Sequence, residues 1–290
     1  SDMGTTNNVT SQMRVITNTG EMIHACREAN RPLGLVPTMG ALHAGHLSLV
    51  DRARADNSTV VVSIFINPAQ FGPGEDVSRY PRDLDADLDL LRHYGVDLVY
   101  VPDVSEVYPE GFETWVDVGS VADKLEGLER PGHFRGVATV VSKLFNITRP
   151  ERAYFGQKDG QQTVVVRKLA RDLDMGVEIV VCPTVREDDG LAMSSRNVRL
   201  DPEQFRAGAT VFWALSQARE LWSGGDVDAD RLRAAVRDSL ETQPLFQQID
   251  YVSVADAETL EELETVTGPT MVSTAVWLGN VRIIDNIIVG

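Results

Sequence analysis

The chain has 290 residues, 43% of them hydrophobic, and a formal net charge of −16 at pH 7. That length and hydrophobic content suffice for a sizeable core and for two domains. A chain so acidic repels the phosphate backbone of nucleic acids unless it carries a concentrated basic face, and no Lys- or Arg-rich run is present, so we expect no nucleic-acid partner.

The sequence also argues against a membrane protein. No apolar run approaches the ~20 residues that a membrane-spanning helix needs, and the N-terminus lacks the layout of a secretory signal. Cys26 and Cys182 have no metal-ligand spacing and are typical of reduced core thiols. We therefore expect a cytoplasmic protein without a membrane partner, with residues 1–6 as a tail outside the fold.

The first part of the chain alternates between strand-like and helix-like patterns. Apolar runs predict buried strands at residues 33–36, 60–66, 98–101, 153–155 and 177–181. Between them, apolar residues recur at helical spacing, as at Leu84, Leu88 and Leu91. This alternation is typical of α/β proteins and predicts a Rossmann-like, doubly wound parallel sheet over residues 14–184, with ligands at the carboxyl ends of the strands.

Two histidines flank a glycine shortly after the strand predicted at residues 33–36. His43 and His46 precede apolar residues at helical spacing, so both imidazoles are expected where a strand turns into a helix. The first turn of a helix attracts anions, and two imidazoles can donate hydrogen bonds to one phosphate. Gly45 leaves room for a base or ribose beside the backbone. The segment indicates a nucleotide site, although a lone histidine pair is as often an ordinary surface feature.

Further along, four aspartates alternate along a predicted helix. Asp83, Asp85, Asp87 and Asp89 are spaced by two, so on a helix they scatter around the axis and would not converge on one metal ion. We interpret them as a solvated helix face, and we expect no metal site built by the protein.

A second polar cluster follows the strand predicted at residues 153–155. Lys158 is a suitable point charge for a transferring phosphoryl group, and Asp159 can cap the helix that begins near Gly160 or orient the lysine. A helix cap beside a solvated lysine is the alternative.

After residue 184 the pattern changes to a smaller α+β domain, over residues 185–290. Helices are predicted at 202–222 and 229–241, and β-rich segments at 249–254 and 271–278. Before them, Ser194, Ser195 and Arg196 follow a glycine-led stretch that can bind phosphates and close as a lid. By itself that composition would indicate only a polar surface turn.

Together these segments resemble the pantothenate synthetases, the pantoate-β-alanine ligases of the nucleotidylyltransferase superfamily that carries the His-x-Gly-His motif. The family pattern Pro-Thr-Met-Gly-Ala-Leu-His-x-Gly-His occurs at residues 37–46, Asn-Pro-x-Gln-Phe at 67–71 and Arg-Pro-x-His-Phe-x-Gly-Val at 130–137. Further matches lie at residues 156–162, 183–187, 193–197 and 282–286. Two positions depart from the family: Gln157 stands where glutamate is usual, and Gly160 where a bulkier residue is common.

The resemblance implies condensation of pantoate with β-alanine through a pantoyl adenylate, with ATP as the third small-molecule substrate and AMP and pyrophosphate released. It implies that His43, His46 and Lys158 are catalytic, that Mg²⁺ enters with ATP, and that the protein is a homodimer. The implied ATP site consists of Met39, Gly40, Ala41, Leu42, His43, Ala44, Gly45, His46, Gly156, Gln157, Lys158, Asp159, Val185, Met193, Ser194, Ser195 and Arg196. The implied pantoate and β-alanine site consists of Gln70, Gln162, Asn67 and His133.

The chemistry fits this set, because a carboxylate is already ionised at neutral pH and its attack on ATP needs positioning and charge stabilisation more than a general base. Two other functions stay open. A nucleotidyltransferase that leaves AMP on its product would share the histidine motif, but the contexts of Gln70 and Gln162 disfavour it. A non-catalytic nucleotide sensor is disfavoured by the complete set of His43, His46 and Lys158. The net charge disfavours a tRNA-charging enzyme.

Overall fold

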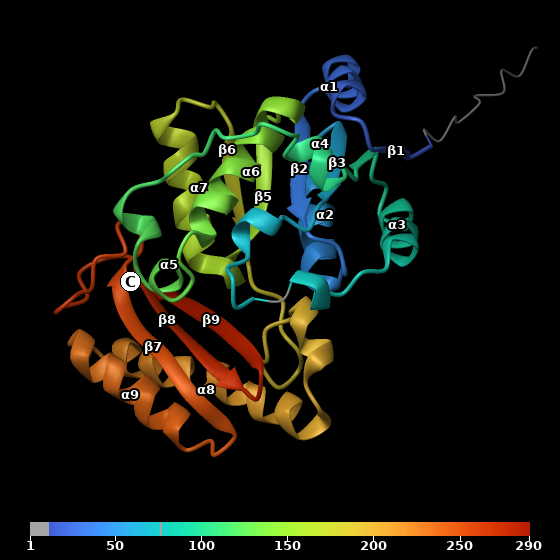
Figure 1. Cartoon of the computed structure of the whole chain (residues 1–290). Coiled ribbons are helices and arrows are strands. Elements are labelled where there is room, and N and C mark those ends of the chain that lie inside the picture. Colours follow the sequence, from blue (N-terminus) through green and yellow to red (C-terminus); the bar gives the residue numbers. More distant parts are fainter. Residues whose placement is uncertain (1–11, 76) are drawn as a thin grey trace, which may run out of the picture.

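The computed structural model describes residues 12–75 and 77–290, so the tail expected at residues 1–6 lies outside the described residues. A six-stranded sheet forms the centre of the larger part (Figure 1), and every strand pair in it is parallel. Its strands are β1 (Arg14–Ile16), β2 (Leu33–Thr38), β3 (Thr59–Ile64), β4 (Leu98–Tyr100), β5 (Arg152–Gly156) and β6 (Glu178–Cys182).

The strand order is β1-β4-β3-β2-β5-β6, so the chain winds outward from β2 in one direction and from β5 in the other. Side chains alternate across the sheet: Leu35 belongs to one core cluster and Val36 to the other. The first cluster includes α1 (Thr19–Glu28), α6 (His133–Thr148) and α7 (Gly160–Asp172), and the second includes α2 (Ala44–Asp56) and α3 (Leu84–His93). The predicted doubly wound sheet is confirmed.

Short helical turns fill the connections on the side where the site lies. The α-helical ones are α4 (Val104–Val107) and α5 (Glu126–Glu129). The 3₁₀ turns are η1 (Pro68–Gln70), η2 (Val77–Arg79), η3 (Ser120–Ala122), η4 (Gln157–Asp159) and η5 (Ser195–Arg199).

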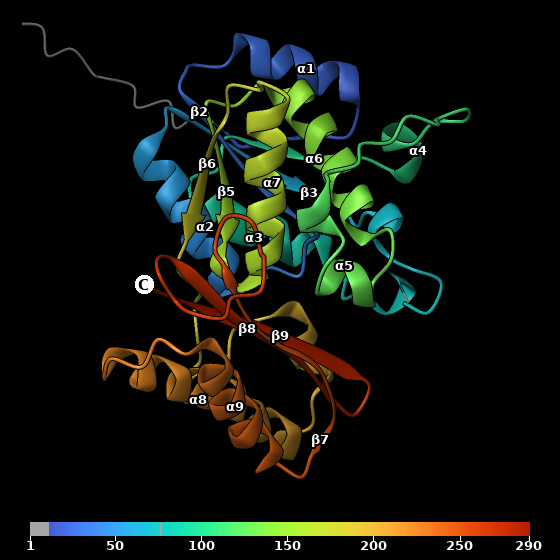
Figure 2. The ribbon, with the colours of Figure 1, turned by 90° about the vertical axis from the view of Figure 1, so that its left-hand side faces the viewer.

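The C-terminal part is an antiparallel sheet in the order β7-β8-β9, covered by two helices. Its elements are α8 (Pro202–Ser223), α9 (Ala229–Glu241), β7 (Phe246–Asp256), β8 (Thr270–Leu278) and β9 (Val281–Val289). Figures 1 and 2 show the helices on the outer face of this sheet and the larger part on its other side. The sequence patterns did not predict strand β9. This strand is buried along most of its length and shows no simple alternation of polar and apolar residues.

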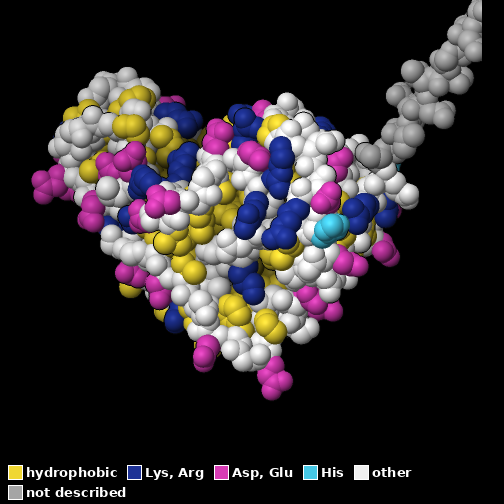
Figure 3. Space-filling view, turned by 90° about the horizontal axis from the view of Figure 1, so that it is seen from above, with side chains coloured by type: hydrophobic (Ala, Val, Ile, Leu, Met, Phe, Trp, Pro, Cys, Tyr) yellow, Lys and Arg dark blue, Asp and Glu magenta, His cyan; other side chains and the backbone are white. Residues whose placement is uncertain are grey.

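Surface side chains are mixed in character. Lys and Arg side chains lie among apolar and acidic ones on the face seen from above (Figure 3), without forming one continuous basic strip there. Within the described ranges, no helix is long and apolar enough to cross a lipid bilayer. Cys26 and Cys182 are both buried and free.

Candidate active site

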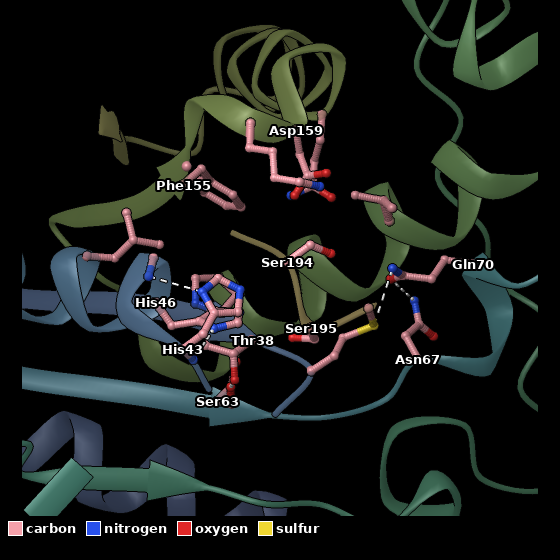
Figure 4. A pocket seen from close by; sticks show the side chains of 18 of the residues that line it. Thr38, His43, His46, Ser63, Asn67, Gln70, Phe155, Asp159, Ser194 and Ser195 are labelled. Atoms are coloured by element: carbon pink, nitrogen blue, oxygen red, sulfur yellow. Dashed lines mark hydrogen bonds between the residues drawn. The ribbon is translucent and has the colours of Figure 1, made fainter. Parts of the chain in front are cut away.

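A cavity of about 230 Å³ opens at the carboxyl ends of β2 and β5. These two strands are neighbours in the sheet, and the chain leaves them in opposite directions, so the cavity lies at the point where open α/β sheets bind ligands. Figure 4 shows Thr38, His43 and His46 on one side, Asp159 and Phe155 opposite them, and Gln70 with Asn67 at the far end.

The two histidines begin α2, and the backbone orients both rings. His43 is the N-cap residue, and its Nδ1 accepts a hydrogen bond from the Gly45 N–H at 3.0 Å. The His43 N–H in turn donates to Nδ1 of His46 at 3.2 Å. Because Nδ1 is the acceptor in both rings, each neutral imidazole carries its proton on Nε2. Both rings can therefore act as hydrogen-bond donors to an anion.

The environment keeps both rings uncharged. Burial, helped by the positive charge of Lys158, lowers the pKa of His43 to about 4. Burial and the neighbouring His43 lower the pKa of His46 to about 3. At neutral pH the pair thus consists of two polar N–H donors and brings no charge of its own.

Gly45 is required by packing, which the sequence did not reveal. A Cβ at this position would lie 2.6 Å from Cε1 of His43, so any side chain here would displace the ring. The expected role of Gly45, to leave room for a base or ribose, stays a prediction.

The expectation that all four aspartates form a solvated face of α3 is wrong for Asp87, which is buried. Its carboxylate is 4% exposed and accepts hydrogen bonds from the N–H groups of Ala41 and Leu42, both at 2.9 Å. The loop needs this anchor because Gly40 (φ 79°) and Ala41 (φ 50°) adopt left-handed backbone conformations, which is costly for alanine. Asp85 and Asp89 are exposed, as expected.

At the far end of the cavity, Asn67 supports Gln70. The Asn67 amide donates to Oε1 of Gln70 at 3.1 Å and to the Gly136 carbonyl at 3.0 Å, while its oxygen accepts from Tyr108 at 2.6 Å. Asn67 is 1% exposed and its polar atoms are occupied. In this geometry Asn67 orients Gln70, whose Nε2 donates, among the described residues, only to the Met39 sulfur at 3.5 Å.

Three further side chains complete this end. Nδ1 of His133 lies 2.8 Å from the Gln70 carbonyl oxygen, so it carries the proton and leaves Nε2 as an acceptor. Burial and the charge of Arg130 lower the pKa of His133 to about 4. Arg130 forms a two-point ion pair with Glu75, with Nη2 3.0 Å from Oε2. Although burial opposes it, this pairing holds the pKa of the Glu75 carboxyl below its usual range.

Two cationic side chains line the cavity, and they come from segments far apart in the sequence. Lys158 lies on η4, directly after β5, and Arg196 lies on η5. Neither forms an ion pair with any residue in the described ranges. Burial lowers the pKa of Arg196, and its guanidinium carbon lies 5.6 Å from the centre of the Tyr80 ring. Two unpaired cations beside two N–H donors make a site for a polyanion.

The serine segment contacts the histidine loop. Ser195 Oγ donates to the Ala41 carbonyl at 2.9 Å, and Ser194 Oγ accepts from the Arg196 N–H at 3.2 Å. Residues 193–196 therefore lie against the loop that precedes α2, although Ser195 and Ala41 are 154 positions apart in the chain.

Most of the expected site residues line this one cavity. They are Met39, His43, Gly45, His46, Asn67, Gln70, His133, Gly156, Lys158, Asp159, Gln162, Val185, Met193, Ser194, Ser195 and Arg196. Gly40, Ala41 and Leu42 form the loop beside it, Ala44 is the first residue of α2, and the Gln157 side chain donates to Asn286. Tyr80 and Ser63 also line the cavity and were missed, because no motif or periodic pattern marks them. Thr38 lines it too, and although it lies within the motif at residues 37–46 it was not among the expected site residues.

No cluster of three or more His, Cys, Asp or Glu side chains in the described ranges could hold a metal ion. The carboxylate that lines the cavity is Asp159. A divalent cation could reach the cavity together with a polyphosphate, whose oxygens supply most of its ligands.

The chain is similar to one family over nearly its whole length. A family model described as pantoate-beta-alanine ligase matches residues 11–288. A pantothenate synthetase from Roseiflexus sp. (strain RS-1) is 59% identical over 274 residues, which cover 94% of this chain and 98% of that protein. A pantothenate synthetase from Acetivibrio thermocellus is 50% identical, and the match covers 96% and 99% of the two chains.

Solved structures agree. The crystal structure of pantothenate synthetase from Thermus thermophilus has a TM-score of 0.91 and 47% identity, covering 95% of this chain and 99% of that one. The pantoate-beta-alanine ligase from Francisella tularensis, solved in complex with beta-gamma ATP and beta-alanine, has a TM-score of 0.78 and 32% identity, covering 95% and 97%.

Proposed function

The chain belongs to the pantoate-β-alanine ligase family, which condenses pantoate with β-alanine and consumes ATP, and we propose that it does so through a pantoyl adenylate formed in the cavity at the carboxyl ends of β2 and β5. The main observation in support is that the Nε2–H donors of His43 and His46 line the same cavity as two unpaired cations, Lys158 and Arg196.

In the first step the pantoate carboxylate attacks the α-phosphorus of ATP, and pyrophosphate leaves. No proton has to be removed from the carboxylate. Negative charge shifts onto the phosphates, and His43, His46 and Lys158 donate hydrogen bonds to them. Ser194, Ser195 and Arg196 bind the outer phosphates that become pyrophosphate.

Gln70 and Gln162 bind the hydroxyl and carboxylate groups of pantoate in this proposal. Asn67 holds the Gln70 amide in one orientation. No hydrogen bond links the Gln162 side chain to another residue of the described ranges, which leaves its amide free for a substrate. Such a site discriminates against analogues that lack the hydroxyls.

In the second step the amine of β-alanine attacks the acyl carbonyl and AMP leaves. The attacking nitrogen must lose a proton, and the departing phosphate is stabilised by the Nε2–H donors of His43 and His46. Nε2 of His133, at the opposite end of the cavity, is an acceptor that lies 3.5 Å from Nη1 of Arg130.

The remaining assignments concern the whole molecule. Residues 14–184 form the nucleotide- and pantoate-binding domain in this proposal, and residues 185–290 form a lid domain. Mg²⁺ accompanies ATP, held mainly by phosphate oxygens and water. We place the enzyme in the cytoplasm as a homodimer.

Pyrophosphate release is the direct test. ATP and pantoate alone should give one enzyme equivalent of pyrophosphate and a tightly held acyl adenylate, recovered by rapid quenching, and β-alanine should start turnover with free AMP. Retention of AMP on a stable product would instead indicate a nucleotidyltransferase. ATP binding without any pyrophosphate would indicate a nucleotide sensor.

A further inference from the structure

We infer that Asn286, on strand β9 of the C-terminal sheet, is a positioning residue that sets Lys158 through the backbone of the lysine's own turn. This inference rests on the role proposed above for Lys158. Among the described residues, the Asn286 side chain hydrogen-bonds only to Gln157 and Lys158, so we place its effect on the reaction at η4.

The Asn286 amide is fully engaged with that turn. Its Nδ2 donates to the carbonyl oxygens of Gln157 at 2.8 Å and Lys158 at 3.1 Å, and its Oδ1 accepts from Nε2 of Gln157 at 2.8 Å. Both amide hydrogens are thus used on consecutive carbonyls. With Asn286 only 4% exposed, these bonds have little competition from water.

Glycine at position 160 makes this contact possible. A Cβ there would lie 2.7 Å from Nδ2 and 3.0 Å from Cγ of Asn286, so a side chain would push the amide away from η4. The two departures from the family pattern, Gln157 and Gly160, therefore both contact Asn286. A glutamate at 157 could not donate to Oδ1 of Asn286.

Asn286 is itself held by the residue before it. Its N–H donates to Oδ1 of Asp285 at 2.7 Å, and Arg186 binds both carboxylate oxygens of Asp285 at 2.5 and 3.0 Å. The Arg186 guanidinium also stacks over the Phe212 ring at 3.9 Å and donates to the Gly190 carbonyl.

This network joins the two cationic segments of the cavity. Arg186 pairs through a β-bridge with Ala192, directly before residues 193–196, while Asn286 holds the turn of Lys158. Through Asn286 and Asp285, the C-terminal sheet therefore contacts both the turn of Lys158 and the residue that bridges to Ala192, ahead of Arg196. A small displacement of such a group is costly, because charge stabilisation depends on its distance from the phosphates.

The test compares Asn286→Ala with Asn280→Ala, an exposed asparagine in the turn between β8 and β9. Single-turnover formation of the adenylate should slow roughly 10- to 100-fold in Asn286→Ala, with a smaller change in ATP affinity. Asn280→Ala should behave as the parent. Amide formation from supplied pantoyl adenylate should change less than adenylate formation.

A double-mutant cycle with Lys158→Ala separates positioning from a general structural role. If Asn286 acts through Lys158, Asn286→Ala should cause no further loss in the Lys158→Ala background. An equal loss in both backgrounds would overturn the inference. A slow Lys158→Ala with a normal Asn286→Ala would also overturn it, whereas a normal Lys158→Ala would contradict the proposed role of Lys158 itself.

Gly160→Ala provides the second variant, because it keeps every atom of Asn286 and alanine is the better helix former at the start of α7. It should show the same selective loss of adenylate formation. If neither variant folds, by circular dichroism and thermal melting, the network serves the fold and the inference is wrong.

Discussion

Nδ1 of His46 accepts the backbone N–H of His43, and the centres of the two imidazole rings lie 4.1 Å apart. The second ring of the pair is therefore oriented by the backbone of the first. In the proposed site both Nε2–H groups donate to the same anion, without the mutual repulsion that two imidazolium ions would suffer at this distance.

A first prediction concerns the protonation of the site histidines. Nitrogen NMR of the free enzyme should show the Nε2–H tautomer for His43 and His46 and the Nδ1–H tautomer for His133, each neutral from pH 8 down to about pH 5. The reason is that burial lowers their pKa values to about 4, 3 and 4. An imidazolium signal from His43 at pH 6 would contradict this.

The same pKa values fix the sign of a stability change. Between about pH 6.5 and pH 4 the unfolded chain binds protons at these histidines that the folded chain does not, so they lower stability as the pH falls through this window. Urea unfolding midpoints measured across that range should decline toward acid. The decline should be shallower in His133→Asn, which cannot bind that proton.

The second prediction separates electrostatic catalysis from binding at Lys158. Removing its ammonium in Lys158→Ala should slow adenylate formation by roughly 10²–10³-fold, the scale for loss of one preorganised donor, with a smaller effect on ATP affinity. Lys158→Arg keeps the charge but displaces it, and should restore part of the rate. Lys168→Ala, on the outer part of α7, is the matched control.

Stopped-flow measurement of the two half-reactions decides the matter. If Lys158→Ala formed the adenylate at the parent rate and instead lost amide formation, Lys158 would belong to the handling of β-alanine or AMP.

The third prediction addresses pantoate selectivity. Gln70→Ala and Gln162→Ala should each raise the KM for pantoate far more than the KM for ATP, with a loss on the order of 1–3 kcal/mol per abandoned polar contact. Gln247→Ala, at an exposed position of β7, should change neither KM. Equal effects on both substrates would remove these amides from the pantoate site.

The fourth prediction tests the anchor of the histidine loop. In Asp87→Asn one of the N–H groups of Ala41 and Leu42 meets an amide NH₂ instead of an oxygen, so we expect a loss of stability of about 1–3 kcal/mol. The KM for ATP should rise because the start of α2 loses its support. Asp85→Asn, exposed on the same helix, is the control, and identical behaviour of the two variants in urea unfolding and kinetics would argue against the anchor.

Local sequence patterns are sufficient to predict the doubly wound sheet, and the resemblance to a known family supplies most of the residues that line the cavity. Strand and helix in this fold follow local hydrophobic periodicity, and the histidine, lysine and serine segments each carry their chemistry within a few consecutive residues. His43, Lys158 and Arg196 are therefore candidates that the family resemblance singles out when the segments are taken together, and the cavity at β2 and β5 brings them together.

How these groups are held and charged depends instead on tertiary packing. Asp87 resembles three other aspartates in the sequence, and its role arises only because α3 packs against a loop 45 residues away. Asn286 likewise reaches η4 across 128 residues, and the neutral state of His43 depends on burial by distant segments. Long-range contacts and burial leave no periodic trace in a single sequence, because they depend on how elements pack and not on how each one forms.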